Sequence, residues 1–194
     1  DTLFVYGMSM EDSSGVYIDN YSLRGSSGWQ LGALRSNICK DFNHLMNYDL
    51  LLLHYGVNVA NEKQTDYAWY AAGMNKVIES LNRNFDSTAI LICGSSDRSI
   101  NVEGNYVTMP SIKTLINTQQ KFASEKHTAY WNFFQAMGGD GSMSEMLNSK
   151  LPLANKDYTH FKPMGGKLMA HQFYDAIIFE TEKRSWETGQ QKKP

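Results

Sequence analysis

The chain has 194 residues, the length of a single domain with a full hydrophobic core. Hydrophobic residues make up 42% of it and charged residues 20%, a globular composition that excludes a disordered or fibrous protein. The formal net charge of −2 excludes the strongly basic surface of a nucleic-acid-binding protein, and no apolar run reaches the roughly 18 residues of a membrane span.

The N-terminal part of the chain predicts two strands and a helix. Leu3 to Tyr6 is a short β-type run, and Val16 to Leu23 is rich in β-branched and aromatic residues. A loop of small residues, Arg24 to Gly28, leads into a helix predicted from about Trp29 to Met46. One face of this helix is apolar at three- and four-residue steps, through Leu31, Leu34, Ile38, Phe42 and Leu45.

Buried strands alternate with amphipathic helices in the middle of the chain. Continuous apolar runs at Tyr48 to Tyr55 and Ala89 to Cys93 are typical of strands buried on both faces of a parallel sheet. The spacing between them predicts a helix from about Asp66 to Phe85. Each strand is followed by a polar loop, the first at Gly56 to Asn61 and the second at Gly94 to Ser99.

The alternation continues toward the C-terminus. Ile100 to Met109 is polar and irregular, and we interpret it as a small excursion over the functional site. Pro110 suits the first turn of a helix, and Thr128 to Phe133 predicts a further strand. A short helix is expected around Ser144 to Ser149 and a final one from about Met164 to Arg184.

Strands that alternate with helices predict βαβ units and hence an α/β fold, a mostly parallel sheet with helices on both faces. We expect one domain over residues 1–194, with a polar, frayed tail at residues 187–194. Cys39 and Cys93 lie in apolar surroundings, which predicts buried thiols rather than a disulfide. The chain begins at Asp1 without an initiator methionine, so we expect a mature or trimmed piece of a longer protein.

The polar loops that begin at Arg24, Gly56 and Gly94 all leave the carboxyl ends of predicted strands, where parallel sheets place their sites. A fourth loop carries Asp157 and His160. A histidine exchanges protons near neutral pH, and a nearby carboxylate can fix its tautomer, so the pair suits acid–base catalysis. The alternative is that Asp157 caps a turn and His160 is a surface residue.

Two of these loops hold groups that can bind an oxyanion. Gly28 ends a Gly-Ser-Ser-Gly stretch before a helix, where backbone N–H groups form an anion-binding nest. Asn58 offers a side-chain amide just after a buried strand, and an amide that converges with a backbone N–H makes an oxyanion hole. The alternatives are a tight turn for Gly28 and a loop or cap role for Asn58.

Together, Ser-Ser-Gly28, Gly56-Val-Asn58 and Asp157-Tyr-Thr-His160 resemble, in order, the second, third and fifth blocks of the SGNH, or GDSL-type, hydrolases. The resemblance implies a three-layer, flavodoxin-like fold. It makes His160 the general base, Asp157 its orienting partner, and Gly28 N–H with the Asn58 amide the oxyanion hole. Val59 stands where the family usually has an acidic residue, which leaves the fine geometry of that loop open.

The family's first block, Gly-Asp-Ser, is absent from this sequence. Ser9 is the nearest substitute, but it lies only 19 residues before Gly28, too few for a strand, a helix and their connections. Ser26 and Ser27 belong to the oxyanion loop and are poorer candidates. We therefore expect the nucleophilic serine, its strand and the first helix upstream of Asp1, with residues 1–12 ending an upstream or inserted β domain.

Other residues have alternative interpretations. Ser27, Asp97 and Arg98 lie on loops at the expected site edge and are candidate substrate contacts, while structural hydrogen bonding is the alternative for Asp97 and Arg98. His54 either lines the site or packs in the core. Trp29 and Trp131 either stack on sugar rings or pack in the core.

The resemblance implies a serine esterase that removes acyl groups, above all acetyl, from carbohydrate or cell-wall glycan, without a metal or organic cofactor. It also implies a bacterial, periplasmic or secreted protein. The alternative is a domain that keeps the fold and the cleft but binds glycan without cleaving it. A flavodoxin-like nucleotide binder is disfavoured, because no phosphate-loop glycine pattern follows any strand.

Overall fold

Three parallel strands form the centre of the computed structural model, which describes residues 2–5, 8 and 10–190, with side chains through residue 184. The strands are β1 (Leu50–His54), β2 (Ala89–Cys93) and β5 (Ala129–Trp131), in the order β1-β2-β5. Leu51 pairs with Ile90 and Leu91 with Ala129. The predicted parallel α/β sheet is confirmed.

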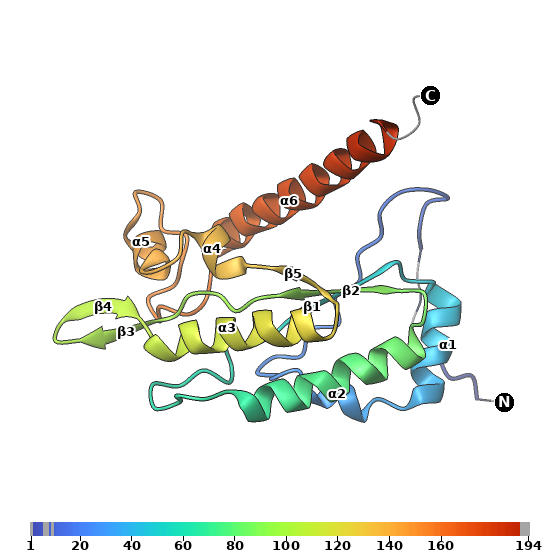
Figure 1. The fold of residues 1–194 in the computed structure, drawn as a ribbon, viewed down its shortest axis with the longest axis horizontal. Helices are drawn as coiled ribbons and strands as arrows, with labels where there is room; N and C mark the ends of the chain where they lie inside the picture. The colour runs from blue at the N-terminus through green and yellow to red at the C-terminus, as the bar shows by residue number, and fades with distance from the viewer. Residues whose placement is uncertain (1, 6–7, 9, 191–194) are drawn as a thin grey trace.

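Helices cover the two faces of this sheet, as Figure 1 shows. Helices α2 (Ala68–Asn84) and α3 (Pro110–Glu125) lie on one face, where they share a core with Leu51, Leu53, Ile90 and Ile92. Helix α6 (Pro163–Gln190) lies on the other face, and its Met169 belongs to a second core with Cys93 and Leu91. Successive residues of a strand point to opposite faces, so β2 contributes Ile90 and Ile92 to the first core and Leu91 and Cys93 to the second.

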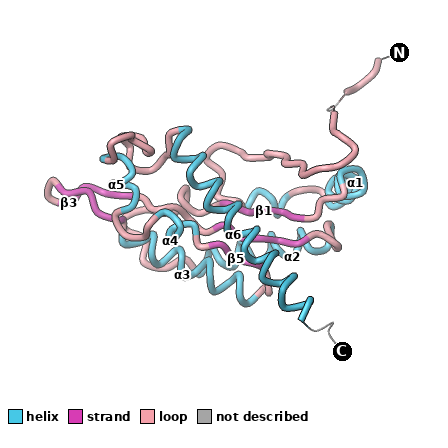
Figure 2. Tube along the Cα trace, turned by 90° about the horizontal axis from the view of Figure 1, so that it is seen from above, coloured by secondary structure: helices cyan, strands magenta, loops and turns pink. Residues whose placement is uncertain are grey.

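The N-terminal prediction is only partly correct. No described residue of the two predicted strands at Leu3–Tyr6 and Val16–Leu23 forms regular secondary structure; Tyr6 itself lies outside the described residues. The predicted helix from Trp29 to Met46 is broken into a 3₁₀ turn, η1 (Trp29–Ala33), and α1 (Ser36–Met46), because Leu34 has an extended backbone. In Figure 2 the loop before η1 runs past the outer side of β1.

The stretch from Ile100 to Met109 is regular, which corrects the predicted irregular loop. It forms an antiparallel hairpin of β3 (Ser99–Val102) and β4 (Asn105–Thr108). The two turn residues, Glu103 and Gly104, both have positive φ, 51° and 89°, as a tight two-residue hairpin turn requires. Glutamate rarely adopts this conformation, so the sequence carried little sign of the turn.

The C-terminal part contains one helix that the sequence did not predict. Strand β5 ends at Trp131, and α4 (Phe133–Met137) follows at once, because the Asn132 side chain accepts a hydrogen bond from Gln135 N and caps it. Helix α5 (Ser142–Asn148) was predicted within two residues. Helix α6 continues to Gln190, so residues 187–190 are helical, while 191–194 lie outside the described residues.

The chain leaves much apolar surface in contact with solvent. Its accessible surface is 13634 Å², whereas a folded monomer of 22.0 kDa exposes about 9300 Å² on the usual size scaling. Leu50 and Leu52 of β1 are 41% and 45% exposed, and the apolar stripe of α1 is open at Leu34, Ile38, Phe42 and Leu45. On α6 the exposed apolar side chains are Met164, Leu168, Tyr174, Ile177, Ile178 and Phe179. Among the described helices, none combines the length and hydrophobicity needed to cross a membrane.

Candidate active site

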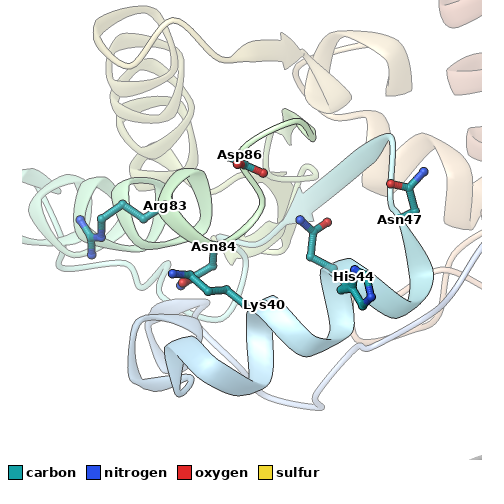
Figure 3. A pocket seen from close by; sticks show the side chains of 7 residues that line it. Lys40, His44, Asn47, Arg83, Asn84 and Asp86 are labelled. Atoms are coloured by element: carbon teal, nitrogen blue, oxygen red, sulfur yellow. The ribbon is translucent and has the colours of Figure 1, made fainter.

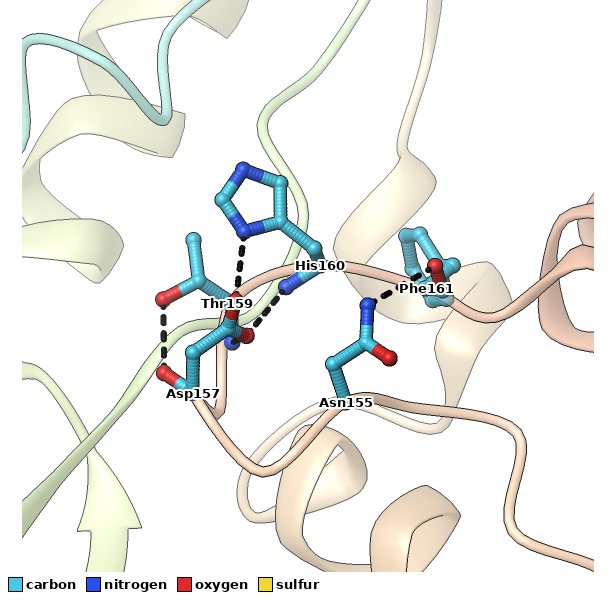
Figure 4. Close-up of polar contacts among 5 residues, drawn as sticks. All are labelled: Asn155, Asp157, Thr159, His160 and Phe161. Atoms are coloured by element: carbon cyan, nitrogen blue, oxygen red, sulfur yellow. Dashed lines mark hydrogen bonds and ion pairs between the residues drawn. The ribbon is translucent and has the colours of Figure 1, made fainter.

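Asp157 and His160 form a hydrogen-bonded pair in the loop before α6 (Figure 4). His160 Nδ1 lies 2.8 Å from Asp157 Oδ2, and the other carboxylate oxygen accepts the backbone N–H groups of Thr159 and His160 at 3.0 and 2.9 Å. The same carboxylate therefore folds the turn and contacts the ring. With Nδ1–H donating to Asp157, Nε2 is left as the proton acceptor.

The electrostatics of the pair favour an ionised Asp157. Partial desolvation raises the pKa of this carboxyl, but the hydrogen bonds donated by His160 and Thr159 outweigh it and hold the pKa below its usual range. The side chains of His160 and Asp157 remain 68% and 51% exposed. The pair is thus preformed and open to solvent.

Short-range backbone contacts close the loop around this pair. Asn155 N–H donates to the His160 carbonyl at 2.8 Å, and the Asn155 side chain donates to the Phe161 carbonyl at 3.3 Å (Figure 4). Ala154 and Phe161 form an isolated antiparallel bridge. Between Asp157 and Thr159 the chain reverses at Tyr158, whose φ is +54°. The turn therefore depends on one non-glycine residue in the left-handed region.

The structure brings the loops of Gly28 and Asn58 together. Asn58 Nδ2 donates to the Ser26 carbonyl at 3.0 Å, and since a side-chain amide has two N–H groups, the second is available to a ligand. Gly28 has φ +95°, and a Cβ there would lie 2.9 Å from the Tyr55 ring, so only glycine fits. Its N–H donates to Ser26 Oγ at 3.1 Å, so an incoming oxygen would have to share or replace that contact.

Hydrogen bonds join four loops in sequence along the carboxyl edge of the sheet. The loop of Ser26 is joined to that of Asn58, and Arg98 Nη1 then donates to the Ala60 carbonyl at 3.0 Å. Ser99 N–H in turn donates to the Tyr158 carbonyl at 3.0 Å, next to Asp157. The four loops therefore form one connected rim. The loops after β1 and β2 leave the carboxyl ends of their strands as expected, whereas no described strand precedes the loop that begins at Arg24.

For Asp97 the sequence offered two alternatives, a substrate contact and structural hydrogen bonding, and in the structure its side chain is buried and hydrogen-bonded. Its side chain is 0% exposed, and Oδ2 accepts the Met143 N–H at 2.9 Å at the start of α5. Burial raises the pKa of Asp97, while hydrogen bonds from Met143, Thr108, Arg98 and Ser142 oppose that rise. Arg98 is half-buried and ties two rim loops, and Ser27 lies half-buried between Ser26 and Gly28.

Gln119 is a buried residue of the rim that the sequence analysis missed. It lies on α3 and is 1% exposed; its Nε2 donates to the Tyr55 carbonyl at 2.7 Å and its Oε1 accepts the Ser95 N–H at 2.9 Å. It therefore fixes the backbone just beyond β1 to the backbone just beyond β2. A polar residue within an apolar helix stripe was the only available signal.

The remaining candidates divide between packing and surface positions. The His54 ring packs on Phe133 with centroids 4.8 Å apart, so that neighbouring atoms desolvate it and lower its pKa, but the residue still has an exposed face. Trp131 packs against Phe133 and Phe173, whereas Trp29 is partly exposed and meets Trp69 edge-on. Cys39 and Cys93 are buried free thiols, as predicted.

The described part of this rim contains no serine that is hydrogen-bonded to His160 and could act as its nucleophile. Among the described residues, the His160 ring hydrogen-bonds only to Asp157, and no serine hydroxyl is bonded to its Nε2. Ser26 Oγ is engaged by Gln30 and Gly28, and Ser9 lies outside the described residues. No three His, Cys, Asp or Glu side chains within the described ranges gather closely enough to hold a metal ion.

A separate polar hollow lies at the opposite edge of the sheet (Figure 3). Its lining comes from α1, from the end of α2 and from the loops that lead into β1 and β2, and includes Lys40, His44, Asn47, Arg83, Asn84 and Asp86. Asn47 and Asp86 precede the amino ends of their strands. The hollow is therefore distinct from the rim of Asp157 and Asn58.

Comparisons with known proteins agree on the fold. No family model and no curated protein matches the chain. Among solved structures, a peptidoglycan O-acetylesterase matches with a TM-score of 0.71 at 24% identity, over 82% of this chain and 45% of that protein. An acetyl xylan esterase matches with a TM-score of 0.54 at 17% identity, over 80% of this chain and 78% of that one.

A third structure, a protein from Parabacteroides merdae described as a GDSL-like lipase, matches with a TM-score of 0.52 at 16% identity, over 74% of this chain and 68% of that one. The chain spans less than half the length of the peptidoglycan O-acetylesterase. At these identities the likeness concerns the fold. The chain has the α/β fold of the SGNH, or GDSL-type, esterases and lipases.

Proposed function

We propose that this chain is part of a serine ester hydrolase that removes O-acetyl groups from carbohydrate. The observation that carries the proposal is the hydrogen-bonded Asp157–His160 pair, joined through a continuous rim of loops to the amide of Asn58. The fold shared with a peptidoglycan O-acetylesterase and an acetyl xylan esterase supports the choice of ester and of glycan.

In the proposed reaction, His160 Nε2 takes the proton of a serine hydroxyl while the serine oxygen attacks the ester carbonyl carbon. Asp157, which is ionised, stabilises the imidazolium. The free N–H of Asn58 and the backbone N–H of Gly28 bind the oxyanion. When the tetrahedral intermediate collapses, the bond to the sugar oxygen breaks and that oxygen takes the proton from His160. Water activated by His160 then attacks the acyl-enzyme, which releases acetate and restores the serine hydroxyl.

We place the serine on an additional strand that pairs with the free edge of β1. Within the described residues, β1 pairs only with β2, and its outer edge offers unpaired backbone groups. The loop containing Val16–Leu23 passes beyond that edge, and Tyr21 and Asp19 reach Tyr48 just before β1. A strand inserted between β1 and the loop of Val16–Leu23 would end at the same rim as Asn58.

The handedness of parallel crossovers indicates where the helix of such a unit lies. Helices α2 and α3 connect strands in the direction from β1 to β5 and share one face. In this proposal Val16–Leu23 pairs with the added strand as the next parallel strand. The connection to it runs the opposite way, so a right-handed crossover puts its helix on the face of α6. Leu50 and Leu52 are exposed on that face and would be covered.

The test uses the full-length protein, a fluorophosphonate probe and an aryl acetate substrate. We expect covalent labelling of one serine outside residues 1–194, and a loss of turnover by orders of magnitude in His160→Ala. His44→Ala, an exposed histidine in the opposite hollow, is the matched control and should keep full activity. Unlabelled protein, or unchanged turnover in His160→Ala, would reject the esterase.

A second candidate is a glycan-binding domain without hydrolytic activity. The observation that favours it is the absence, among described residues, of a serine bonded to His160. Binding of an acetylated glycan by a protein that neither reacts with the probe nor releases acetate would select this candidate.

A further inference from the structure

The loop of Asp157 and His160 is not held by its own backbone alone. Tyr158, between them, has φ +54°, a conformation that a side chain with a Cβ disfavours. This reversal lets the N–H groups of Thr159 and His160 both face Asp157 Oδ1. If Tyr158 relaxed to an ordinary conformation, these two bonds and the ring contact to Asp157 would separate.

An aromatic side chain from the β3–β4 hairpin rests on this residue. The rings of Tyr106 and Tyr158 are stacked, with centroids 3.6 Å apart and an interplanar angle of 7°. The hairpin and the loop are also joined at the backbone, where Ser99 N–H donates to the Tyr158 carbonyl at 3.0 Å. Tyr158 is thus held on two sides by β3 and β4.

The hairpin itself is firmly attached at its base. Met109 is buried, its N–H donates to the Arg98 carbonyl at 2.8 Å, and Thr108 Oγ1 accepts the Gly141 N–H at 2.7 Å. At the tip, Gly104 N–H donates to Asn101 Oδ1 at 2.9 Å and closes the turn. Tyr106 therefore projects from a braced element onto Tyr158, which is half-buried, while Asp157 and His160 on either side of Tyr158 are exposed.

We infer that Tyr106 is a positioning residue, which holds Tyr158 in its left-handed conformation and thereby keeps His160 aligned with Asp157. Its importance for catalysis rests on the proposed esterase function, but its effect on the loop does not. The stack uses the ring and not the hydroxyl, since the structure gives the Tyr106 hydroxyl no part in it. A phenylalanine should therefore replace it.

The experiment compares Tyr106→Ala, Tyr106→Phe and Val107→Ala in the full-length protein. Val107 is the matched control, because it is a similarly exposed neighbour on β4 whose side chain points to the other face of the hairpin. Amide hydrogen exchange at Thr159 and His160 is measured by NMR, and kcat and KM are measured on an aryl acetate.

In Tyr106→Ala we expect exchange at both amides to rise about two- to twelvefold, the range that the strength of an aromatic pair implies. We expect kcat to fall by a similar factor at unchanged KM, with Tyr106→Phe and Val107→Ala like the wild type. Unchanged exchange in Tyr106→Ala, or unchanged kcat despite faster exchange in an active enzyme, would overturn the inference. A wild type without activity would reject the esterase, and exchange would still decide whether Tyr106 holds the loop.

Discussion

The side-chain amide of Asn58 donates a 3.0 Å hydrogen bond to the carbonyl of Ser26, across 32 residues of sequence. This bond orients the amide at the end of β1 and uses one of its two N–H groups, which leaves the second for a ligand. An amide fixed in this way needs no reorganisation when charge develops on a bound oxygen, which is the condition for strong oxyanion stabilisation.

Replacement of Asn58 by alanine should therefore lower kcat of the full-length protein by about 10²–10³-fold with little change in KM, as loss of one oxyanion donor does elsewhere. Steady-state kinetics on an aryl acetate measure it. Asn61→Ala, an exposed residue three positions along the same loop, should remain fully active. Equal effects of the two substitutions would show that the loop, and not the amide, matters.

Asp157→Asn should reduce kcat by about 10²–10⁴-fold without unfolding the protein, because an amide N–H facing Nδ1 favours the wrong imidazole tautomer. One oxygen would remain to accept the N–H groups of Thr159 and His160, so the turn should survive. Kinetics combined with circular dichroism distinguish the two effects. Full activity in this variant would remove Asp157 from the mechanism.

The same carboxylate should make the loop sensitive to acid. The pKa of Asp157 is lowered in the folded protein, so its contribution to stability is present above its unfolded pKa and is lost as pH falls through the folded value. The difference in stability between wild type and Asp157→Asn should shrink as the pH falls below about 4, the unfolded range of aspartate. Urea unfolding at several pH values tests this, and a constant difference would contradict it.

Gln119→Leu should destabilise the protein by about 2–4 kcal/mol, because it leaves the buried Tyr55 carbonyl and Ser95 N–H without partners. The loss should appear in the urea midpoint of the full-length protein and should lower activity by loosening the rim. Gln120→Leu, its exposed neighbour on α3, is the control and should stay within about 0.5 kcal/mol of the wild type.

Leu52→Asp tests the added strand–helix unit. Leu52 is 45% exposed in this chain, but the unit would bury it, so the charge should cost at least about 2 kcal/mol in the full-length protein. Leu151→Asp, at an exposed leucine outside the sheet, should be nearly neutral. If both variants unfold at the temperature of the wild type, the face of β1 beside α6 is not covered.

The sequence was most informative about elements whose residue pattern lies within one continuous segment. The apolar run before Gly56 and the stripe between Asp66 and Phe85 gave β1 and α2 almost at their observed bounds, because alternation and helical spacing are local properties. The Asp157–His160 contact was also foreseeable, since both residues belong to one short turn. The residues of Val16–Leu23 have strand propensity but no described partner strand, and they form none.

By itself the sequence determined the alternation of strands and helices, the order of the loops at one sheet edge and the chemical character of the groups on them. Only the tertiary structure decided which of these groups are buried and which stay exposed on the rim. Asp97 and Asn58 occupy similar loop positions, yet Asp97 is buried against α5 and Asn58 remains on the rim. Tyr106 and Gln119 support the rim from a hairpin and a helix far along the chain. Such contacts depend on packing between distant segments, and local propensity does not encode them.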